Sequence, residues 1–455
     1  MCGIIGAVSR EDNNVAPEIY AGLWSLQHRG KESAGMVTYD DGKLEFERGM
    51  GTVETVFGDN ILSRLCGKSG IGHVRYSTAG ESSLTNAQPV SGYFQGEQFW
   101  LAHNGNLVRY MDLRSTTEKN GYAFQTTIDT ELIAALIHLS KCADFGDALE
   151  DALSKVEGTY ALIALYRGQV FGVRDPTGNR PLVIGKGRGM TILASESAAC
   201  DVLAIQTLRD VEPGEMIVID PVLGNWYNIK NTRVSAPEKF CIFEYVYFLR
   251  PDSKFLGRRA QSVREQMGRY LWHEHPVHAD MVIPVPDSGN FAAFGLSKES
   301  GLPTEMALFR SHYVGRTFIE PLGKKRSSHL RIKFNVIPEI VHDKRVVLVD
   351  DSIVRASVMR GVIELLRLAG AKEIHVRISC PPYLHPCYYG IDTYRVKGEL
   401  IAKRHGGDIE MIRREIGADS LGYLSLEKLK QAVSGKNSFD FCDACFSGNY
   451  HIPIK

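Results

Sequence analysis

The stretch "VVLVDDSIVRAS", residues 346–357, places four apolar residues and two acids ahead of a small polar turn. Apolar runs without polar alternation favour a strand that is covered on both faces, as in a parallel sheet. Similar runs occur at 281–286 and 373–378, and a helix is predicted from about Ser357 to Ala369, ended by Gly370. Its predicted apolar stripe is Val358, Val362, Leu365, Leu366 and Ala369. The pattern therefore predicts a strand, loop, helix, strand unit of a parallel sheet.

The two acids follow the strand at the edge where ligands of parallel sheets bind. Asp350 and Asp351 can serve one ligand only if the chain leaves the strand there, because consecutive strand side chains point to opposite faces. The helix start that follows offers backbone N–H groups to a phosphate. Paired acids beside a phosphate seat indicate a phosphorylated sugar held with a divalent ion. The alternative for this pattern is a solvated strand end.

Length and composition restrict the class of protein. The 455 residues predict two domains, and equal numbers of basic and acidic residues, 53 each, argue against binding to nucleic acid or an anionic membrane. We expect no membrane span and a cytoplasmic location, because no basic leader and no sufficiently long apolar segment occur. Nine scattered cysteines favour thiol chemistry or metal ligation over disulfides.

The first half alternates short strand-like runs with amphipathic helices, predicted near 18–26 and 129–139. The polar segment 228–240 is the predicted linker, which gives domains 2–235 and 236–455. At the N-terminus, Cys2 follows Met1 directly. Removal of Met1, expected as the only maturation cut, would join a thiol to an α-amine with a reference pKa of about 8 that can serve as its base. The alternative is a small buried cysteine at the start of a strand.

Several long motifs occur in the order typical of one family. The second half has "VIPVPDSG" at 282–289, "YVGRTFI" at 313–319, "KRVVLVDDSIVR" at 344–355 and "HPCYYGID" at 385–392. The first half has "MCGIIG", "SLQHRGKESAG" at 25–35, "GHVRYST" at 72–78, "LAHNGNL" at 101–107, "IDTE" at 128–131 and "VRDPTGNRPL" at 173–182. The acidic loop resembles that of type I phosphoribosyltransferases, and the whole chain resembles the glutamine phosphoribosylpyrophosphate amidotransferases.

The resemblance implies an α+β N-terminal nucleophile glutaminase with four αββα layers, followed by an α/β type I phosphoribosyltransferase domain with a parallel sheet. Cys2 would be the nucleophile, and Asn104 and Gly105 would form the oxyanion hole. The predicted glutamine pocket consists of Arg29, Gly30, Arg75, Thr78 and Asp129. Arg75 would bind the carboxylate of free L-glutamine, and Asp129 its ammonium.

The resemblance also implies an acceptor site for phosphoribosyl pyrophosphate. Its residues would be Arg310, Tyr313, Arg316, Lys333, Asp350, Asp351, Ser352, Arg355 and Ser357, with Mg²⁺ held by Ser288, Asp350 and Asp351. The basic segment 323–333 would be a closing flap. Two departures suggest weaker or redirected acceptor binding: Ala356-Ser357-Val358 stands where Gly-Thr-Thr is usual, and "RSHY" at 310–313 where "KNRY" is usual.

The remaining cysteines include a CxxC pair, Cys442 and Cys445. The spacing alone is compatible with zinc, a redox pair or an iron–sulfur cluster. The cluster-bearing branch of the family uses four cysteines, here Cys241, Cys387, Cys442 and Cys445, which implies a [4Fe–4S] cluster with a structural role.

The resulting prediction is an enzyme, a glutamine-dependent amidophosphoribosyltransferase of purine synthesis. It transfers ammonia from glutamine to C1 of phosphoribosyl pyrophosphate and yields phosphoribosylamine, glutamate and pyrophosphate. The family implies a homotetramer inhibited by purine nucleotides. Two alternatives remain: an amidotransferase with another phosphosugar or nucleoside acceptor, and a non-catalytic ligand sensor on the same fold.

Overall fold

The computed structural model describes residues 1–11, 13–76, 80–222, 225–230, 236–311, 334–394, 397–435 and 439–454. Side chains of β1 (Gly3–Ser9) alternate between two hydrophobic clusters, and these clusters mark the layers of the N-terminal half. Ile4 and Val8 point into a hydrophobic cluster that contains residues of two sheets. Ile5 and Ala7 point the other way, into a cluster with helix residues. One strand therefore packs on a second sheet with one face and on helices with the other.

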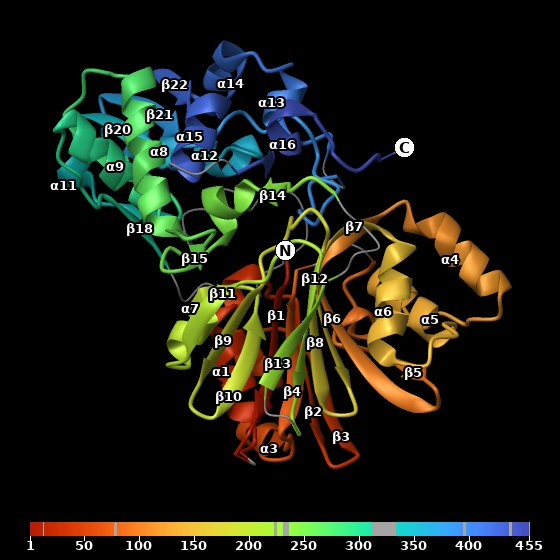
Figure 1. Cartoon of the computed structure of the whole chain (residues 1–455). Helices are drawn as coiled ribbons and strands as arrows, with labels where there is room; N and C mark the ends of the chain where they lie inside the picture. Colours follow the sequence, from red (N-terminus) through yellow and green to blue (C-terminus); the bar gives the residue numbers. More distant parts are fainter. Residues whose placement is uncertain are drawn as a thin grey trace.

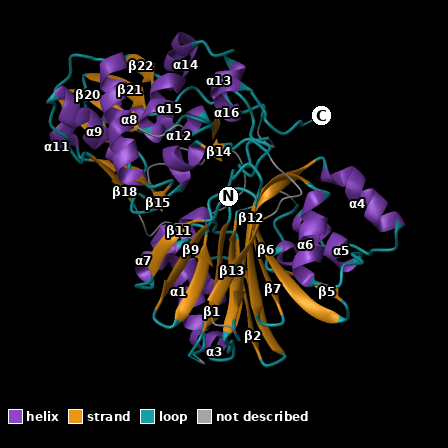
Figure 2. Ribbon diagram, viewed as in Figure 1, coloured by secondary structure: helices purple, strands orange, loops and turns teal. Residues whose placement is uncertain are grey.

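The two sheets stack face to face in the lower part of Figure 2. In the described chain, the first consists, in order, of β11 (Gln206–Asp210), β9 (Val183–Gly187), β10 (Met190–Ala194), β1, β4 (Ser69–Arg75), β2 (Ser33–Asp40) and β3 (Lys43–Met50). The second consists of β13 (Asn225–Lys230), β12 (Glu215–Asp220), β8 (Gln169–Arg174), β7 (Glu157–Tyr166), β6 (Glu97–Val108) and β5 (Val90–Phe94).

Helices cover the outer face of each sheet. The first sheet is covered by α1 (Ala16–Ser25), α2 (Val53–Val56), α3 (Asp59–Leu62) and α7 (Ser197–Val202). Beside the second sheet lie α4 (Tyr110–Lys119), α5 (Thr130–His138) and α6 (Phe145–Ser154). The predicted four-layer αββα arrangement is confirmed, and the helices predicted near 18–26 and 129–139 correspond to α1 and α5.

The second half contains a parallel sheet in the order β17 (Met281–Pro284), β20 (Arg345–Asp350), β21 (Glu373–Ile378) and β22 (Ser420–Tyr423). Its helices are α8 (Ala260–Glu274), α9 (Asn290–Ser300), α11 (Pro338–Val341), α12 (Ala356–Leu368), α13 (Ile401–Arg404), α14 (Ile409–Ile416), α15 (Leu426–Ser434) and α16 (Ala444–Ser447). Short strand pairs join β14 (Phe240–Cys241) to β23 (Phe441–Cys442), β15 (Lys254–Phe255) to β16 (Arg258–Arg259), and β18 (Leu308–Arg310) to β19 (Phe334–Val336). The predicted parallel sheet is confirmed.

The apolar stripe predicted for α12 needs correction. The buried residues of this helix are Ala356, Met359, Val362, Ile363 and Leu366, whereas the side chain of Val358 is 39% exposed. The prediction is wrong at Val358. Since α12 begins at residue 356, the first side chain that faces the core is that of Ala356. Gly370 does follow the helix, with a left-handed φ of 90°.

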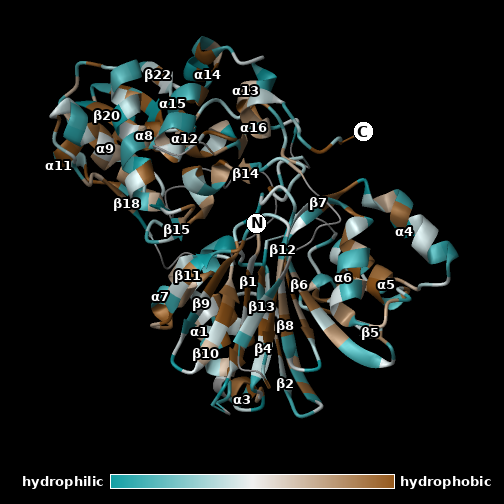
Figure 3. Ribbon diagram, viewed as in Figure 1, coloured by the Kyte–Doolittle hydropathy of each residue, from teal (hydrophilic) through white to brown (hydrophobic). Residues whose placement is uncertain are grey.

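The two halves meet at the N-terminus, which lies at the junction in Figure 1. Met1 and Val108 belong to the same hydrophobic cluster as the core of the second half. Figure 3 shows the apolar residues concentrated on the strands of both halves. The predicted boundary after residue 235 adjoins residues 231–235, which lie outside the described part of the chain. No described helix is long and apolar enough to cross a membrane.

Candidate functional site

Cys2 immediately precedes β1, which lies between β10 and β4 in the first sheet. Its side chain is buried, and its Sγ donates to the carbonyl of Tyr76 at 3.5 Å. The Cys2 N–H donates to Oδ1 of Asn104 at 3.1 Å, and the Cys2 carbonyl accepts from Nε of Arg29 at 2.9 Å. The thiol and both backbone groups of this residue are therefore held in place.

Met1 is buried beside Cys2 with its sulfur against the guanidinium of Arg180. Burial lowers the pKa of the Met1 amine to about 5, and the nearby arginines contribute in the same direction. A terminal amine in this environment is neutral at pH 7. Only the neutral form can accept a proton from a thiol.

Asn104 and Gly105 lie in β6, opposite Ala161 and Tyr160 of β7. Nδ2 of Asn104 is buried and has no hydrogen-bond partner among the described residues. A Cβ at position 105 would come within 1.9 Å of the Thr159 carbonyl oxygen, so only glycine fits there. An unpartnered buried donor beside a cysteine is what an oxyanion hole requires.

The predicted glutamine-binding residues surround this centre. Arg75 at the end of β4 contacts a carboxylate oxygen of Glu32 at 3.0 Å, and a Cβ at Gly30 would come within 2.4 Å of the Arg75 backbone. Oδ2 of Asp129 accepts from a backbone N–H at 2.8 Å, and its other oxygen lies 3.9 Å from His103. Burial lowers the pKa of His103, so a neutral ring leaves the Asp129 charge available for an ammonium. Thr78 lies outside the described residues.

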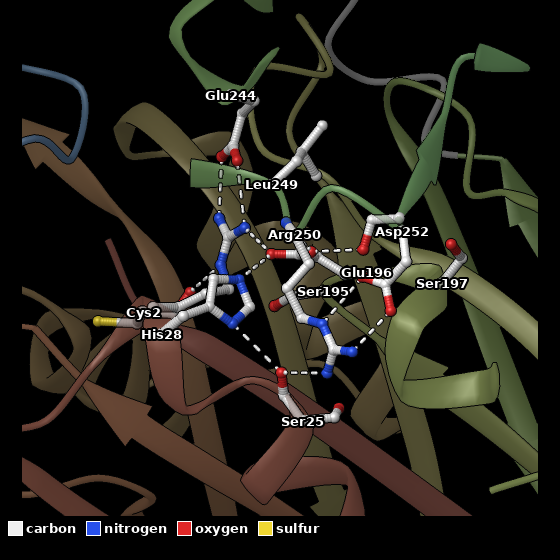
Figure 4. Close-up of polar contacts among 12 residues, drawn as sticks. Cys2, Ser25, His28, Ser195, Glu196, Ser197, Glu244, Leu249, Arg250 and Asp252 are labelled. Carbon is white, nitrogen blue, oxygen red and sulfur yellow. Dashed lines mark hydrogen bonds and ion pairs between the residues drawn. The ribbon is translucent and has the colours of Figure 1, made fainter. Parts of the chain in front are cut away.

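Arg29 forms a buried ion cluster with two acids, one from each half of the chain. Its guanidinium contacts Oε1 of Glu196 at 2.5 Å and both carboxylate oxygens of Glu244 at 2.9 and 3.1 Å. Figure 4 shows Glu196 and Glu244 approaching the same point near Cys2. Burial alone would lower the pKa of Arg29, but the two carboxylates raise it, and Arg29 therefore stays charged.

The second centre lies at the carboxyl end of β20. Asp350 and Asp351 are buried, and the Asp351 N–H donates to Oδ1 of Asp350 at 2.8 Å. The hydroxyl of Ser288, after β17, donates to the same oxygen at 3.4 Å. Burial raises the pKa of both carboxyl groups, and the charge of Asp351 raises that of Asp350 further. Two buried acids with raised pKa values and a hydroxyl fit a hard divalent cation.

The other predicted acceptor residues lie around the carboxyl end of β20 and the start of α12, on β18, or outside the described residues. The hydroxyl of Ser352 donates to Asp351, and Arg355, the N-cap of α12, contacts Glu399 at 3.2 Å. Ser357 is exposed in the first turn of α12, and Arg310 donates to Asp287 at 3.1 Å. Tyr313, Arg316, Lys333 and the basic segment lie within 312–333, outside the described residues.

Comparison with known proteins agrees with this geometry along the whole chain. A glutamine amidotransferase domain family matches residues 73–201. The amidophosphoribosyltransferase of Methanothermobacter thermautotrophicus is 44% identical over 459 residues, covering 100% of this chain and 95% of that protein. That of Bacillus subtilis is 43% identical over 460 residues, covering 100% and 94%. The chain belongs to the amidophosphoribosyltransferase family.

A solved structure supports the same assignment. The B. subtilis glutamine phosphoribosylpyrophosphate amidotransferase, described as complexed with ADP and GMP, matches with a TM-score of 0.93 and 41% identity, covering 100% of this chain and 98% of that one. The two-domain fold predicted for an amidophosphoribosyltransferase is thereby confirmed.

The four cysteines predicted to bind a cluster come together in this amidophosphoribosyltransferase. Cys241, Cys387, Cys442 and Cys445 are buried and free, and Cys241 pairs in register with Cys442 between β14 and β23. Burial raises the pKa of Cys241, Cys442 and Cys445, and the charges of neighbouring cysteines raise it further. No group of three or more His, Cys, Asp or Glu side chains in the described chain is arranged around a single metal ion. Cysteine thiolates are the donors that iron–sulfur clusters use, and a [4Fe–4S] group at these four buried thiols stays a prediction.

Several residues of the amidophosphoribosyltransferase site were missed from the sequence. Glu196, Glu244 and Arg264 are buried charged residues, and motif order alone did not single them out. Glu244 did carry a signal, because it is the one acid in the otherwise apolar run "CIFEYVYF" at 241–248. An acid in such a run needs a buried cation, and Arg29 supplies it.

Proposed function

We propose that the N-terminal half hydrolyses the side-chain amide of L-glutamine and that the second half joins the released ammonia to C1 of phosphoribosyl pyrophosphate. The observation that carries the first part is the buried thiol of Cys2 beside the unpartnered amide nitrogen of Asn104. The full-length relationship supports phosphoribosyl pyrophosphate over another acceptor or a non-catalytic sensor. The products are 5-phosphoribosylamine, glutamate and pyrophosphate.

The first step is attack of the Cys2 sulfur on the amide carbon of glutamine. Removal of Met1 frees the Cys2 amine, which takes the thiol proton and passes it to the leaving ammonia. Asn104 Nδ2 and the Gly105 N–H stabilise the oxyanion, and each such donor typically contributes about 10²- to 10³-fold in rate. Water then hydrolyses the thioester and releases glutamate. Arg75 and Asp129 hold the charged ends of glutamine meanwhile.

In the second step ammonia attacks C1 and pyrophosphate leaves. Asp350, Asp351 and Ser288 would hold Mg²⁺, which neutralises charge on the departing pyrophosphate. The first backbone N–H groups of α12 are available to the 5′-phosphate. The exposed Val358 lacks the hydroxyl that a threonine would offer there, which favours weaker acceptor affinity rather than a different reaction.

The interface between the two halves supports internal transfer of ammonia. Cys2 is buried, and side chains of β6 and β7 donate hydrogen bonds to the second half. The Asn106 amide donates to the Tyr388 carbonyl at 2.9 Å, and the Thr159 hydroxyl donates to the Tyr389 carbonyl at 2.7 Å. A sealed interface confines ammonia and excludes water.

The assay for this function uses anaerobically purified protein with Mg²⁺ and phosphoribosyl pyrophosphate. Glutamine should yield glutamate and pyrophosphate in equal amounts, and ammonium salts should support pyrophosphate release without glutamate. Glutaminase activity that ignores phosphoribosyl pyrophosphate and releases no pyrophosphate would contradict the proposal.

We propose further that Cys241, Cys387, Cys442 and Cys445 bind a [4Fe–4S] cluster that fastens the C-terminal strand β23 to β14. Replacing Cys442 with serine should remove the broad visible absorption, the iron and the acid-labile sulfide of the anaerobic protein. It should also lower the melting temperature, because a ligand that binds only the folded state stabilises it. Cys66→Ser, at an exposed thiol, is the control and should leave all three unchanged. Wild-type protein without iron and sulfide would refute the cluster.

We propose three further features: the cellular compartment, the regulators and the oligomeric state. The nine free cysteines favour a reducing compartment, the cytoplasm. The B. subtilis relative is described with bound ADP and GMP, which favours purine nucleotides as regulators here. The resemblance to the family is the support for a homotetramer.

A further inference from the structure

The hydrogen bond from Arg29 to the Cys2 carbonyl depends on Glu244, a residue of the other domain. The Arg29 guanidinium is fully buried and donates from Nε to this carbonyl at 2.9 Å. Its two terminal nitrogens face carboxylates, and Glu244 accepts from both, at 2.9 and 3.1 Å. This two-point contact fixes the plane of the guanidinium and hence the direction of its Nε–H. Glu244 therefore orients the group that holds the nucleophile's backbone.

Glu196 cannot take over this role. Besides Arg29, it accepts from the backbone N–H of Arg250 at 2.9 Å and from the hydroxyl of Ser253 at 2.6 Å, and it contacts His28 at 2.7 Å. Figure 4 shows Glu196 within these contacts and Glu244 above and apart from them. Among the described residues, the Glu244 carboxylate contacts Arg29 and, at 3.5 Å, Arg180. Several groups therefore fix Glu196, whereas the position of Glu244 depends on the backbone segment that carries it.

That segment is a short π-helix, Glu244–Phe248. Arg264 of α8 donates to the carbonyls of Tyr245 and Leu249, both at 2.8 Å, and so holds both ends of the segment. Polar contacts therefore lead from Arg264 through the π-helix to Glu244, Arg29 and Cys2. π-helical segments are frequent at functional sites.

We propose that Glu244 is a positioning residue for glutamine hydrolysis: through Arg29 it sets the position of the Cys2 backbone. This inference rests on the proposed function. A purely structural role, fastening the two domains together, is the competing explanation.

The test compares two rates in each preparation of Glu244→Gln: pyrophosphate release with glutamine and with ammonia. Ammonia bypasses Cys2, so the ratio of the two rates does not depend on the fraction of folded protein. We expect the glutamine-dependent kcat to fall about 10- to 100-fold, as for a lost charge-assisted hydrogen bond. The KM for glutamine should change less than about threefold, because a positioning residue acts on the transition state more than on binding.

Two further variants separate positioning from fastening. Glu244→Asp keeps the charge and should recover part of the glutamine-dependent rate. Asp252→Asn is the matched control, because it weakens the Arg250–Asp252 pair in the same cluster without touching Arg29, and its ratio should equal that of the wild type. Equal falls of both rates in Glu244→Gln, or an unchanged ratio, would overturn the inference. A wild-type protein that transfers no ammonia would instead refute the proposed function, and the effect of Glu244 would still be read from glutamine hydrolysis.

Discussion

Cys2→Ala should lower glutamine-dependent pyrophosphate release by about 10⁴-fold or more, the typical order for loss of a covalent nucleophile. The ammonia-dependent rate should stay within about twofold of the wild type, because ammonia enters after the step that needs the thiol. Alanine preserves the backbone contacts of residue 2 with Asn104 and Arg29. It removes only the sulfur and its contact with the Tyr76 carbonyl. The melting temperature should therefore change little.

The measurement is pyrophosphate release with each nitrogen donor, together with glutamate formation. Cys142→Ala removes a thiol far from Cys2 in sequence and serves as the control, with both rates unchanged. Persistent glutamate formation in Cys2→Ala would show that another group is the nucleophile. Loss of both rates with a normal melting temperature would show that Cys2 also takes part in the transfer step.

The sequence predicted both folds because their signals are local. Strand runs such as 346–350 are uninterrupted and apolar, and Ile4 and Ile5 face opposite layers as alternation requires. Motif order also selected Cys2, Asn104 and Asp350 as candidate site residues, and they lie at strand ends or in central strands. The burial predicted for Val358 is wrong, because the spacing of apolar residues does not show at which residue a helix begins.

The buried charges between the domains could not be predicted in the same way. Glu244 and Arg29 are 215 positions apart, and their contact depends on how the two domains dock. Docking depends on the surfaces of the two folded domains, and a local hydrophobic periodicity in the sequence does not describe these surfaces. A lone acid in an apolar run shows that some cation must meet it, but the identity of that cation comes only from the structure.

The second large effect is expected at the acceptor acids. Asp350→Asn should lower pyrophosphate release by about 10³-fold with glutamine and with ammonia alike, because it removes a charge that would hold Mg²⁺ at the reacting pyrophosphate. The amide oxygen of asparagine can still accept the hydrogen bonds from the Asp351 N–H and the Ser288 hydroxyl. Glutaminase activity without phosphoribosyl pyrophosphate should remain. This pattern is the reverse of that expected for Cys2→Ala, so the two variants assign one half-reaction to each domain.

Stability should change in the opposite direction to activity. Burial and the Asp351 charge raise the pKa of Asp350, so the ionised form destabilises the folded protein at pH 7. Without Mg²⁺, Asp350→Asn should therefore raise the free energy of unfolding by about 1 kcal/mol, or the melting temperature by about 2–4 °C. The gain should increase as the pH rises and should vanish below about pH 4, where the aspartate is protonated in both folded and unfolded states.

The matched control is Asp280→Asn, which lies outside the acceptor centre. Arg345 lowers the pKa of Asp280 through hydrogen bonds at this partly exposed position, so its charge stabilises the fold, and the stabilisation is lost as pH falls. Its replacement should cost at most about 1 kcal/mol at pH 7 and leave both rates intact. If Asp350→Asn also lowered the melting temperature in Mg²⁺-free buffer, the acid would be a structural residue. If Asp350→Asn raised the free energy of unfolding and Asp280→Asn lowered it, the paired buried acids would be kept for the reaction at a cost in stability.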